Sequence, residues 1–255
     1  MMSMMPDGAK FKAYEKAEMR VLPENTYAVI RFDGKSFSSF TKQYDRPYDS
    51  RFMEAMDETT RMVCSMIPGA VLGYTQSDEI SVVFHDLAQK NSQMWFNGKV
   101  DKMLSVGAAT VTGAFLRALD FRFTGFPVFD ARVHTLDGVA EVEEYVRWRR
   151  FDAQKNSITM AAGVLFSHRQ LQGVSTKDRA AMLVGTEYEV LPEGFFNGRL
   201  TWKETYMVPG HSVVQSSVKN AQPKTQPVEV ARTRWVTVPA TRDVMETEFV
   251  QHVSV

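Results

Sequence analysis

Residues 70–84 have the sequence AVLGYTQSDEISVVF, in which two apolar runs flank the polar segment Gln76-Ser77-Asp78-Glu79. Short runs rich in β-branched and aromatic residues, separated by a few turn residues, are typical of a β-hairpin. We therefore predict strands over residues 70–74 and 80–84, with both acidic residues at the tip of the hairpin.

The elements on either side of this hairpin follow one order. A strand at residues 27–32 ends at Asp33-Gly34, and a helix is predicted from residues 47–50 to Met66, before Pro68-Gly69. After the hairpin, a helix over residues 96–119 leads to an alternating strand over 129–134. The order strand, helix, strand, strand, helix, strand predicts an α+β fold, a ferredoxin-like (βαββαβ) sheet covered by two helices on one face.

The remainder of the chain has weaker patterns. An amphipathic helix is predicted over residues 141–162, then shorter elements separated by glycines, then a segment with mixed charge and three prolines. We therefore divide the chain into a core over residues 1–140, a helical and irregular part over 141–215 that completes the same domain, and a C-terminal extension of uncertain order over 216–255.

Composition excludes several classes of protein. Thirty Lys and Arg residues balance thirty Asp and Glu residues, so the chain lacks the positive charge from which a sequence-independent polyanion binder gains affinity. The single cysteine, Cys64, excludes an internal disulfide and a Cys-rich zinc site. No uncharged apolar run has the roughly 18–20 residues that cross a bilayer, and residues 1–7 lack a secretory signal core. We expect a cytoplasmic protein with no membrane partner.

Three carboxylates are predicted to meet at one edge of the sheet. Asp33 ends the first strand, and Asp78 and Glu79 lie in the hairpin with which that strand pairs in a ferredoxin-like sheet. Clustered carboxylates repel one another and are stabilised by divalent cations, and Mg²⁺ needs only one or two of them. Two such ions would activate an attacking oxygen and neutralise a leaving pyrophosphate, with the Gly34 carbonyl as a further ligand.

Each acidic motif also has an ordinary structural interpretation. Asp-Gly after a strand and Ser-Asp-Glu in a hairpin are both common turn sequences. Only their combination with the predicted topology favours a metal site.

Four basic residues could hold a triphosphate near these carboxylates. Arg46 precedes a predicted helix start, where anions are favoured, and Lys35 follows the first Asp-Gly. Lys99 and Lys102 stand about one turn apart on one helix face, which could equally be a solvated surface.

The third predicted helix carries a polar stripe formed by Arg149, Asp152 and Asn156. Such a stripe either lines a site or faces water. Trp148 and Tyr145 lie beside the stripe. We expect these two aromatic side chains to lie in the core or at an interface, and not to stack on a base.

Several segments together resemble the tRNA(His) guanylyltransferases and the Thg1-like 3′-to-5′ polymerases. The segments occur in the family's order between about residues 10 and 210, and the hairpin tip is the most specific of them. They are RFDGKSF (31–37), RPYDSR (46–51), YTQSDEISVVF (74–84), FDARV (129–133), WRRFD (148–152), KNS (155–157) and LQGVSTK (171–177).

The resemblance implies a polymerase-type palm, with residues 1–140 as its catalytic core. It implies a nucleotidyltransferase that adds a nucleotide to the 5′ end of tRNA or a similar RNA, with two Mg²⁺ ions and with GTP and ATP as substrates. It also implies a homo-oligomer, since relatives form tetramers.

The resemblance further implies roles for individual residues. Asp33, the Gly34 carbonyl and Asp78 would be metal ligands, and Glu79 would be an adjacent essential carboxylate. The implied nucleotide-binding residues are Lys35, Ser36, Phe37, Ser38, Arg46, Ser77, Lys99, Lys102 and Asn156.

The sequence departs from the eukaryotic guanylyltransferases at three positions. Gln154 and Ser157 replace a histidine and an asparagine of their His-x-x-Asn-Asn segment, and Ser38 replaces a histidine. These departures favour a relative that copies a template strand to repair 5′ ends, or one with another RNA or nucleotide preference. Two other functions stay open: a palm-domain nucleotide cyclase or synthase, and a non-catalytic nucleotide- or RNA-binding module.

Overall fold

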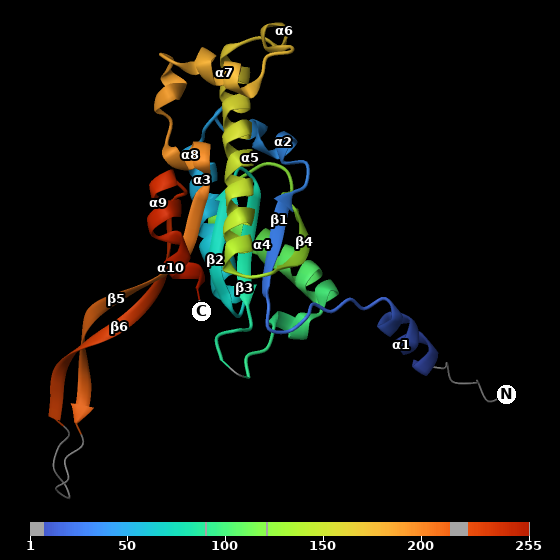
Figure 1. Cartoon of the computed structure of the whole chain (residues 1–255), viewed down its shortest axis with the longest axis vertical. Coiled ribbons are helices and arrows are strands. Elements are labelled where there is room, and N and C mark those ends of the chain that lie inside the picture. The colour runs from blue at the N-terminus through green and yellow to red at the C-terminus, as the bar shows by residue number, and fades with distance from the viewer. Residues whose placement is uncertain (1–7, 90, 121, 215–223, 255) are drawn as a thin grey trace, which may run out of the picture.

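A six-stranded antiparallel sheet forms the centre of the computed structural model, which describes residues 8–89, 91–120, 122–214 and 224–254 (Figure 1). The strand order is β4-β1-β3-β2-β5-β6. The strands are β1 (Tyr27–Gly34), β2 (Ala70–Gln76), β3 (Glu79–His85), β4 (Phe129–Leu136), β5 (Arg199–Val214) and β6 (Lys224–Pro239). The first four strands have the order of the predicted ferredoxin-like sheet, so the α+β fold is confirmed.

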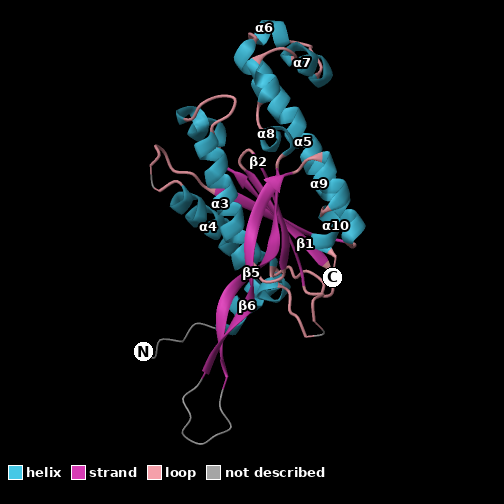
Figure 2. Cartoon of the chain, turned by 90° about the vertical axis from the view of Figure 1, so that its left-hand side faces the viewer, coloured by secondary structure: helices cyan, strands magenta, loops and turns pink. Residues whose placement is uncertain are grey.

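Helices cover both faces of this sheet. Helices α3 (Ser50–Met66) and α4 (Val100–Ala118) cover one face, as predicted, and α5 (Val139–Leu165) runs across the other (Figure 2). Because both faces are buried, every residue of β3 is buried and the strand has no polar face turned to solvent. The carboxyl end of β1 and the tip between β2 and β3 therefore lie at one rim of the sheet, between the two helix layers.

Shorter helices complete the chain. They are α1 (Gly8–Ala17), α2 (Phe37–Phe40), α6 (His168–Leu171), α7 (Thr176–Leu183), α8 (Glu193–Asn197), α9 (Arg242–Thr247) and α10 (Phe249–Val253), with 3₁₀ turns at Thr41–Gln43, Trp95–Gly98 and Glu187–Val190. No helix in the described ranges has both the length and the apolar character needed to span a membrane. Cys64 of α3 is buried in the core, with its sulfur against Gly73 of β2.

The structure corrects the expectation of irregular elements followed by an extension of uncertain order. Strands β5 and β6 pair from Arg199↔Pro239 to Val214↔Lys224, whereas β2 pairs only with residues 199–202 of β5. Most of this hairpin therefore projects beyond the sheet as a two-stranded arm (Figure 1). Pro209, Gly210 and Pro227 mask the strand pattern in the sequence, but each arm strand has a free edge that tolerates proline. Residues 215–223 of the predicted extension lie outside the described residues.

The end of the chain belongs to the core. Met245, Phe249 and Val253 from α9 and α10 are buried with residues of β1, β2 and α5. The Tyr27 hydroxyl at the start of β1 donates to the Val253 carbonyl at 2.9 Å. The predicted division of the chain at residues 140 and 215 stays a prediction.

We predict that Phe249→Ala lowers the free energy of unfolding by about 3–5 kcal/mol, because it leaves a cavity in a packed cluster. The matched control Val250→Ala changes the next residue in α10, whose side chain is 47% exposed, and should cost less than about 0.5 kcal/mol. Chemical denaturation of both variants measures the difference. Equal effects would contradict the packing described for α10.

Candidate functional site

The carboxylates predicted to meet do so at the rim of the sheet. Asp33, the next-to-last residue of β1, stands opposite Glu79 in the antiparallel pairing of β1 with β3. The Gly34 amide then donates to the Asp78 carbonyl at 3.2 Å. Residues directly opposite each other in such a pair have side chains on the same face and about 5 Å apart. The end of β1 and the tip of the hairpin are thus one structural unit.

Gly34 is required by the close approach of two side chains. A Cβ atom added at this position would lie 2.4 Å from Phe37 Cδ2 and 2.8 Å from the Asp78 Oδ2 atom. The Phe37 ring is itself buried against Phe115 and Phe129 and has no room to retreat. Only glycine lets the backbone carry its peptide groups this close to the Asp78 carboxylate.

Asp33 and Asp78 form a pair of negative charges that no cation of the described chain neutralises. Asp78 accepts a hydrogen bond from Ser77 Oγ at 3.0 Å, and neither carboxylate has an ion-pair partner among the described residues. Burial raises the pKa of Asp78, and the nearby charge of Asp33 raises it further. Two hard, repelling oxygen donors beside a backbone carbonyl fit a Mg²⁺ site.

The described residues contain no group of three His, Cys, Asp or Glu side chains that could hold a metal ion by themselves. Mg²⁺ does not require such a group, because it binds through one or two carboxylates and completes its shell with water and substrate phosphates.

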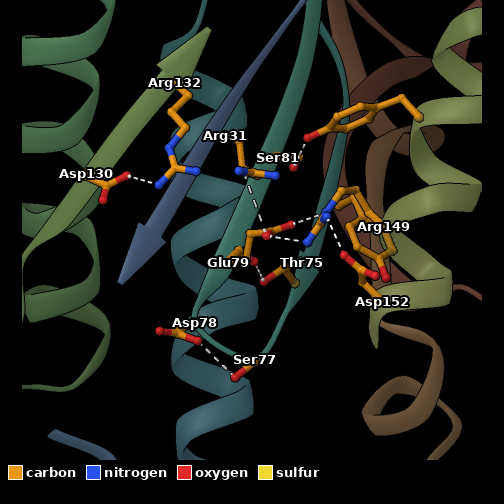
Figure 3. A network of polar contacts seen from close by, with 12 residues as sticks. Arg31, Thr75, Ser77, Asp78, Glu79, Ser81, Asp130, Arg132, Arg149 and Asp152 are labelled. Carbon is orange, nitrogen blue, oxygen red and sulfur yellow. Dashed lines mark hydrogen bonds and ion pairs between the residues drawn. The ribbon is translucent and has the colours of Figure 1, made fainter. Parts of the chain in front are cut away.

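Glu79 has a different environment from the other two carboxylates (Figure 3). Arg149 of α5 donates to it twice, from Nε to Oε1 at 2.7 Å and from Nη2 to Oε2 at 2.6 Å. Arg31 stands 3.9 Å away, and Arg149 also donates to Asp152 at 2.8 Å. Burial raises the pKa of Glu79, while the bonds to Arg149 oppose that rise. Glu79 therefore links the hairpin tip to α5, and both its oxygens are engaged.

The ion pair of Glu79 with Arg149 shows whether the polar stripe on α5 lines the site or faces water. Arg149 is buried and Asp152 pairs with it, so this part of the stripe faces the site. Tyr145 is buried, as predicted for a core residue, whereas Trp148 is 49% exposed and does not belong to the core.

A pocket of about 860 Å³ opens beside Asp78, a size typical of a small-molecule site. Its walls come from the segment after β1, the segment before α3, the hairpin tip and the last turns of α5. The predicted site residues that line it are Gly34, Ser36, Phe37, Ser38, Arg46, Ser77 and Asp78. Sequence reasoning missed the α5 wall, formed by Thr159, Met160, Gly163 and Val164, although it continues one to two turns beyond Asn156.

Two features of the pocket wall favour an anion that binds together with a cation at Asp78. Arg46 lines it and has no ion-pair partner in the described part of the chain. Asp49, which also lines it, is neutralised by Arg51, whose hydrogen bond lowers the pKa of Asp49 to about 2. Asp49 also begins α3 by accepting from the amides of Arg51 and Phe52, which sets the position of the wall.

The other predicted nucleotide-binding residues lie outside this pocket. Lys35 is exposed next to it, and its amide donates to the Val128 carbonyl. Asn156 lines a smaller adjoining pocket. Lys99 and Lys102 lie at the start of α4, where Lys99 bridges to Val21. Lys102 is roughly 20 Å, thirteen helical residues, from Phe115, the α4 residue that packs against Phe37, and Lys99 is farther away. One chain therefore does not bring these two lysines to the pocket, and their role stays a prediction.

Comparison with known proteins gives consistent results. Residues 8–137 match the family model described as tRNAHis guanylyltransferase. The tRNA(His) guanylyltransferase of Schizosaccharomyces pombe is 33% identical over 153 residues, which are 58% of this chain and 56% of that protein. The chain thus spans little more than half the length of this curated relative.

Solved structures match over almost the whole chain. A bacterial tRNA(His) guanylyltransferase (Thg1)-like protein in complex with ATP has a TM-score of 0.79 and 30% identity, covering 98% of this chain and 100% of that one. A bacterial protein of the same description in complex with GTP has a TM-score of 0.76 at 30% identity, covering 97% and 99%.

We predict that Arg149→Met lowers the free energy of unfolding by about 3 kcal/mol, because it leaves the buried Glu79 carboxylate with no hydrogen-bonded cation and only Arg31, 3.9 Å away, as an ion-pair partner. Adding Glu79→Met to this variant should recover part of the loss. Arg147→Met is the control: Arg147 pairs with Glu143 one turn away on the exposed side of the same helix, and its loss should cost about 0.5 kcal/mol or less. Urea denaturation gives all three values.

We predict that Asp78→Asn stabilises the metal-free protein at neutral pH, because it removes a buried carboxylate that Asp33 repels. The folded-state pKa of Asp78 is raised, so its ionisation penalises the folded state above that pKa and not below the unfolded value of 3.8. The advantage of the variant should therefore shrink as the pH falls toward 3.8. Thermal unfolding in EDTA across this range measures it, and a less stable variant at pH 7 would contradict the assignment.

Proposed function

Because the chain belongs to the tRNAHis guanylyltransferase family, we propose that it is a nucleotidyltransferase that adds a nucleotide to the 5′ end of tRNA or a tRNA-like RNA. Growth would then proceed in the 3′-to-5′ direction. The observation that carries this proposal is the unneutralised carboxylate of Asp78 in the wall of a nucleotide-sized pocket, with the charge of Asp33 nearby.

We propose Mg²⁺, as two ions, for this pair of carboxylates. Asp33, Asp78 and the Gly34 carbonyl would hold the metal, since they are oxygen donors without a competing cation in the described chain. When bound, Mg²⁺ supplies charge neutralisation at the phosphates and activation of an attacking oxygen. Glu79 is proposed to keep the hairpin tip at a set distance from α5 through Arg149, and not to bind metal itself.

The pocket residues are proposed to bind a nucleoside triphosphate, GTP or ATP. Relatives solved with ATP and with GTP support both as ligands. Arg46 would pair with a phosphate, and the hydroxyl groups of Ser36, Ser38 and Ser77 would donate to further phosphate or sugar oxygens. Ser36 and Ser77 both have positive φ angles, 59° and 47°, a strained conformation that is common at ligand sites.

The proposal includes three broader expectations. We propose that addition is directed by a template base, because Ser38, Gln154 and Ser157 replace residues found in the eukaryotic guanylyltransferases. We propose a cytoplasmic location, because the RNA substrate and the single buried cysteine suit that compartment. We also propose a homo-oligomer, tetrameric as the resemblance implies. Light scattering of the purified protein would measure its mass in solution.

We predict that Asp33→Ala and Asp78→Ala each reduce nucleotide incorporation by at least about 10²-fold, since bound metal contributes several kcal/mol to such reactions. Asp101→Ala, at the far end of α4, serves as the control and should retain normal turnover. The assay supplies full-length and 5′-truncated tRNAs labelled at the 5′ phosphate, with each of the four triphosphates in turn. Circular dichroism checks that each variant is folded.

The same assay separates the alternative functions. Dependence of the added nucleotide on the opposing base would support template-directed repair. A cyclic or dinucleotide product formed from GTP or ATP without RNA would instead favour a cyclase or synthase. Tight GTP binding with no product from any RNA would favour a binding module.

A further inference from the structure

A second, much smaller pocket adjoins the nucleotide-sized one on the inner side of Ser77. Its volume is about 60 Å³, far below the several hundred Å³ of an independent small-molecule site. The two pockets share a wall formed by Pro47, Asp49, Phe52, Ser77 and Met160. The small pocket therefore suits one chemical group of a ligand whose remainder lies in the large pocket.

Arg199, at the start of β5, lines this small pocket and is only 5% exposed. Its Nε donates to Asp57 of α3, and its Nη1 donates to the Gly194 carbonyl at 3.1 Å. Its stem packs on Gly194, where an added Cβ would lie 2.9 Å from Arg199 Cδ. Three contacts thus hold the guanidinium group in place.

The third nitrogen of this guanidinium group has no partner. Arg199 Nη2 is fully buried and has no hydrogen-bond acceptor in the described part of the chain. Leaving a charged donor buried and unpaired is costly, so such a group is expected to meet an acceptor in the functional state. The structure holds this donor rigidly while supplying nothing for it to bind.

The pocket contains other donors of the same kind. The side-chain amides of Gln76 and Asn156 line it, and neither makes a hydrogen bond to another described residue. The two carboxylates nearest Arg199 and the wall are already neutralised, Asp57 by Arg199 itself and Asp49 by Arg51. The ion pairs Arg199–Asp57 and Arg51–Asp49 leave no net charge among these groups. What the pocket offers is a set of unused N–H donors, one of them on a guanidinium group, and such donors bind phosphoryl oxygens.

We propose that this small pocket is a phosphoryl subsite in which Arg199 Nη2, Gln76 and Asn156 bind one phosphate group. The group belongs to a nucleoside triphosphate in the large pocket or to the 5′ end of the RNA. The inference rests on the proposed function for the identity of the ligand, and it adds Arg199 as a binding residue.

The test measures dissociation constants by isothermal titration calorimetry for wild type and Arg199→Met. One ligand series is GTP, GDP, GMP and guanosine, and the other is one RNA with a 5′ triphosphate, monophosphate or hydroxyl. In one series, Arg199→Met should raise the dissociation constant of the ligand whose phosphate fills the subsite by about tenfold or more. This is the size expected for the loss of a hydrogen bond to a charged group. For members of that series that lack the phosphate, the dissociation constant should change by less than about twofold. The series showing this gradation identifies the source of the phosphoryl group.

Asn156→Asp is a second variant that places a negative charge at the pocket without removing Arg199. Asn156 is exposed, so folding should persist, and the same graded loss is expected. Arg242→Met removes an exposed arginine of α9 and should leave every dissociation constant unchanged. Equal losses for all members of both series, or no loss in either, would overturn the proposal. Because binding is measured without turnover, a protein that binds in this graded manner but incorporates no nucleotide would refute the proposed function alone.

Discussion

The antiparallel pairing of β1 with β3 continues to the last residue before the hairpin tip, and the site depends on that register. Asp33 stands opposite Glu79, and the Gly34 amide bonds to the Asp78 carbonyl. A slip of one residue would turn Asp33 to the opposite face of the sheet and would separate the carboxylates. The register is secured by the apolar residues of the same strands, since both faces of the sheet are packed.

Bringing carboxylates together at a buried rim works against stability. The structure offsets this for Glu79 by supplying Arg149, and it leaves Asp33 and Asp78 without any such partner in the described chain. The difference separates two roles within three acidic residues that look equivalent in sequence. One carboxylate joins two layers of the fold, and the other two remain open to a cation brought from solution. An unrelieved repulsion of this kind is common at functional sites.

The same division applies to the arginines of the site. The guanidinium group of Arg149 donates to two carboxylates of this chain, those of Glu79 and Asp152. In contrast, Arg199 Nη2 has no hydrogen-bond partner, and Arg46 has no ion-pair partner, among the described residues. The small pocket that Arg199 lines is assembled from α3, the hairpin tip, α5, α8 and the start of β5, so widely separated parts of the sequence surround it. The hairpin of β5 and β6 contributes Arg199 to the wall of this pocket, and pairing with β2 holds residues 199–202 in the sheet.

The sequence alone determined the order of the palm elements and the meeting of Asp33 with the hairpin tip, because both follow from local periodicity and from the pairing rules of antiparallel strands. The family resemblance of the sequence also singled out Ser36, Phe37, Ser38, Arg46 and Ser77, all of which line the large pocket. Only the tertiary structure decided the rest. Whether the α5 stripe faces water or the site depends on how α5 is rotated over the sheet, and periodicity does not set that angle. The long arm was hidden because proline is compatible with a free strand edge, which exists only after the sheet is assembled. The unpaired nitrogen of Arg199 is a property of its surroundings, and those come from residues as distant as Asp57 and Gly194.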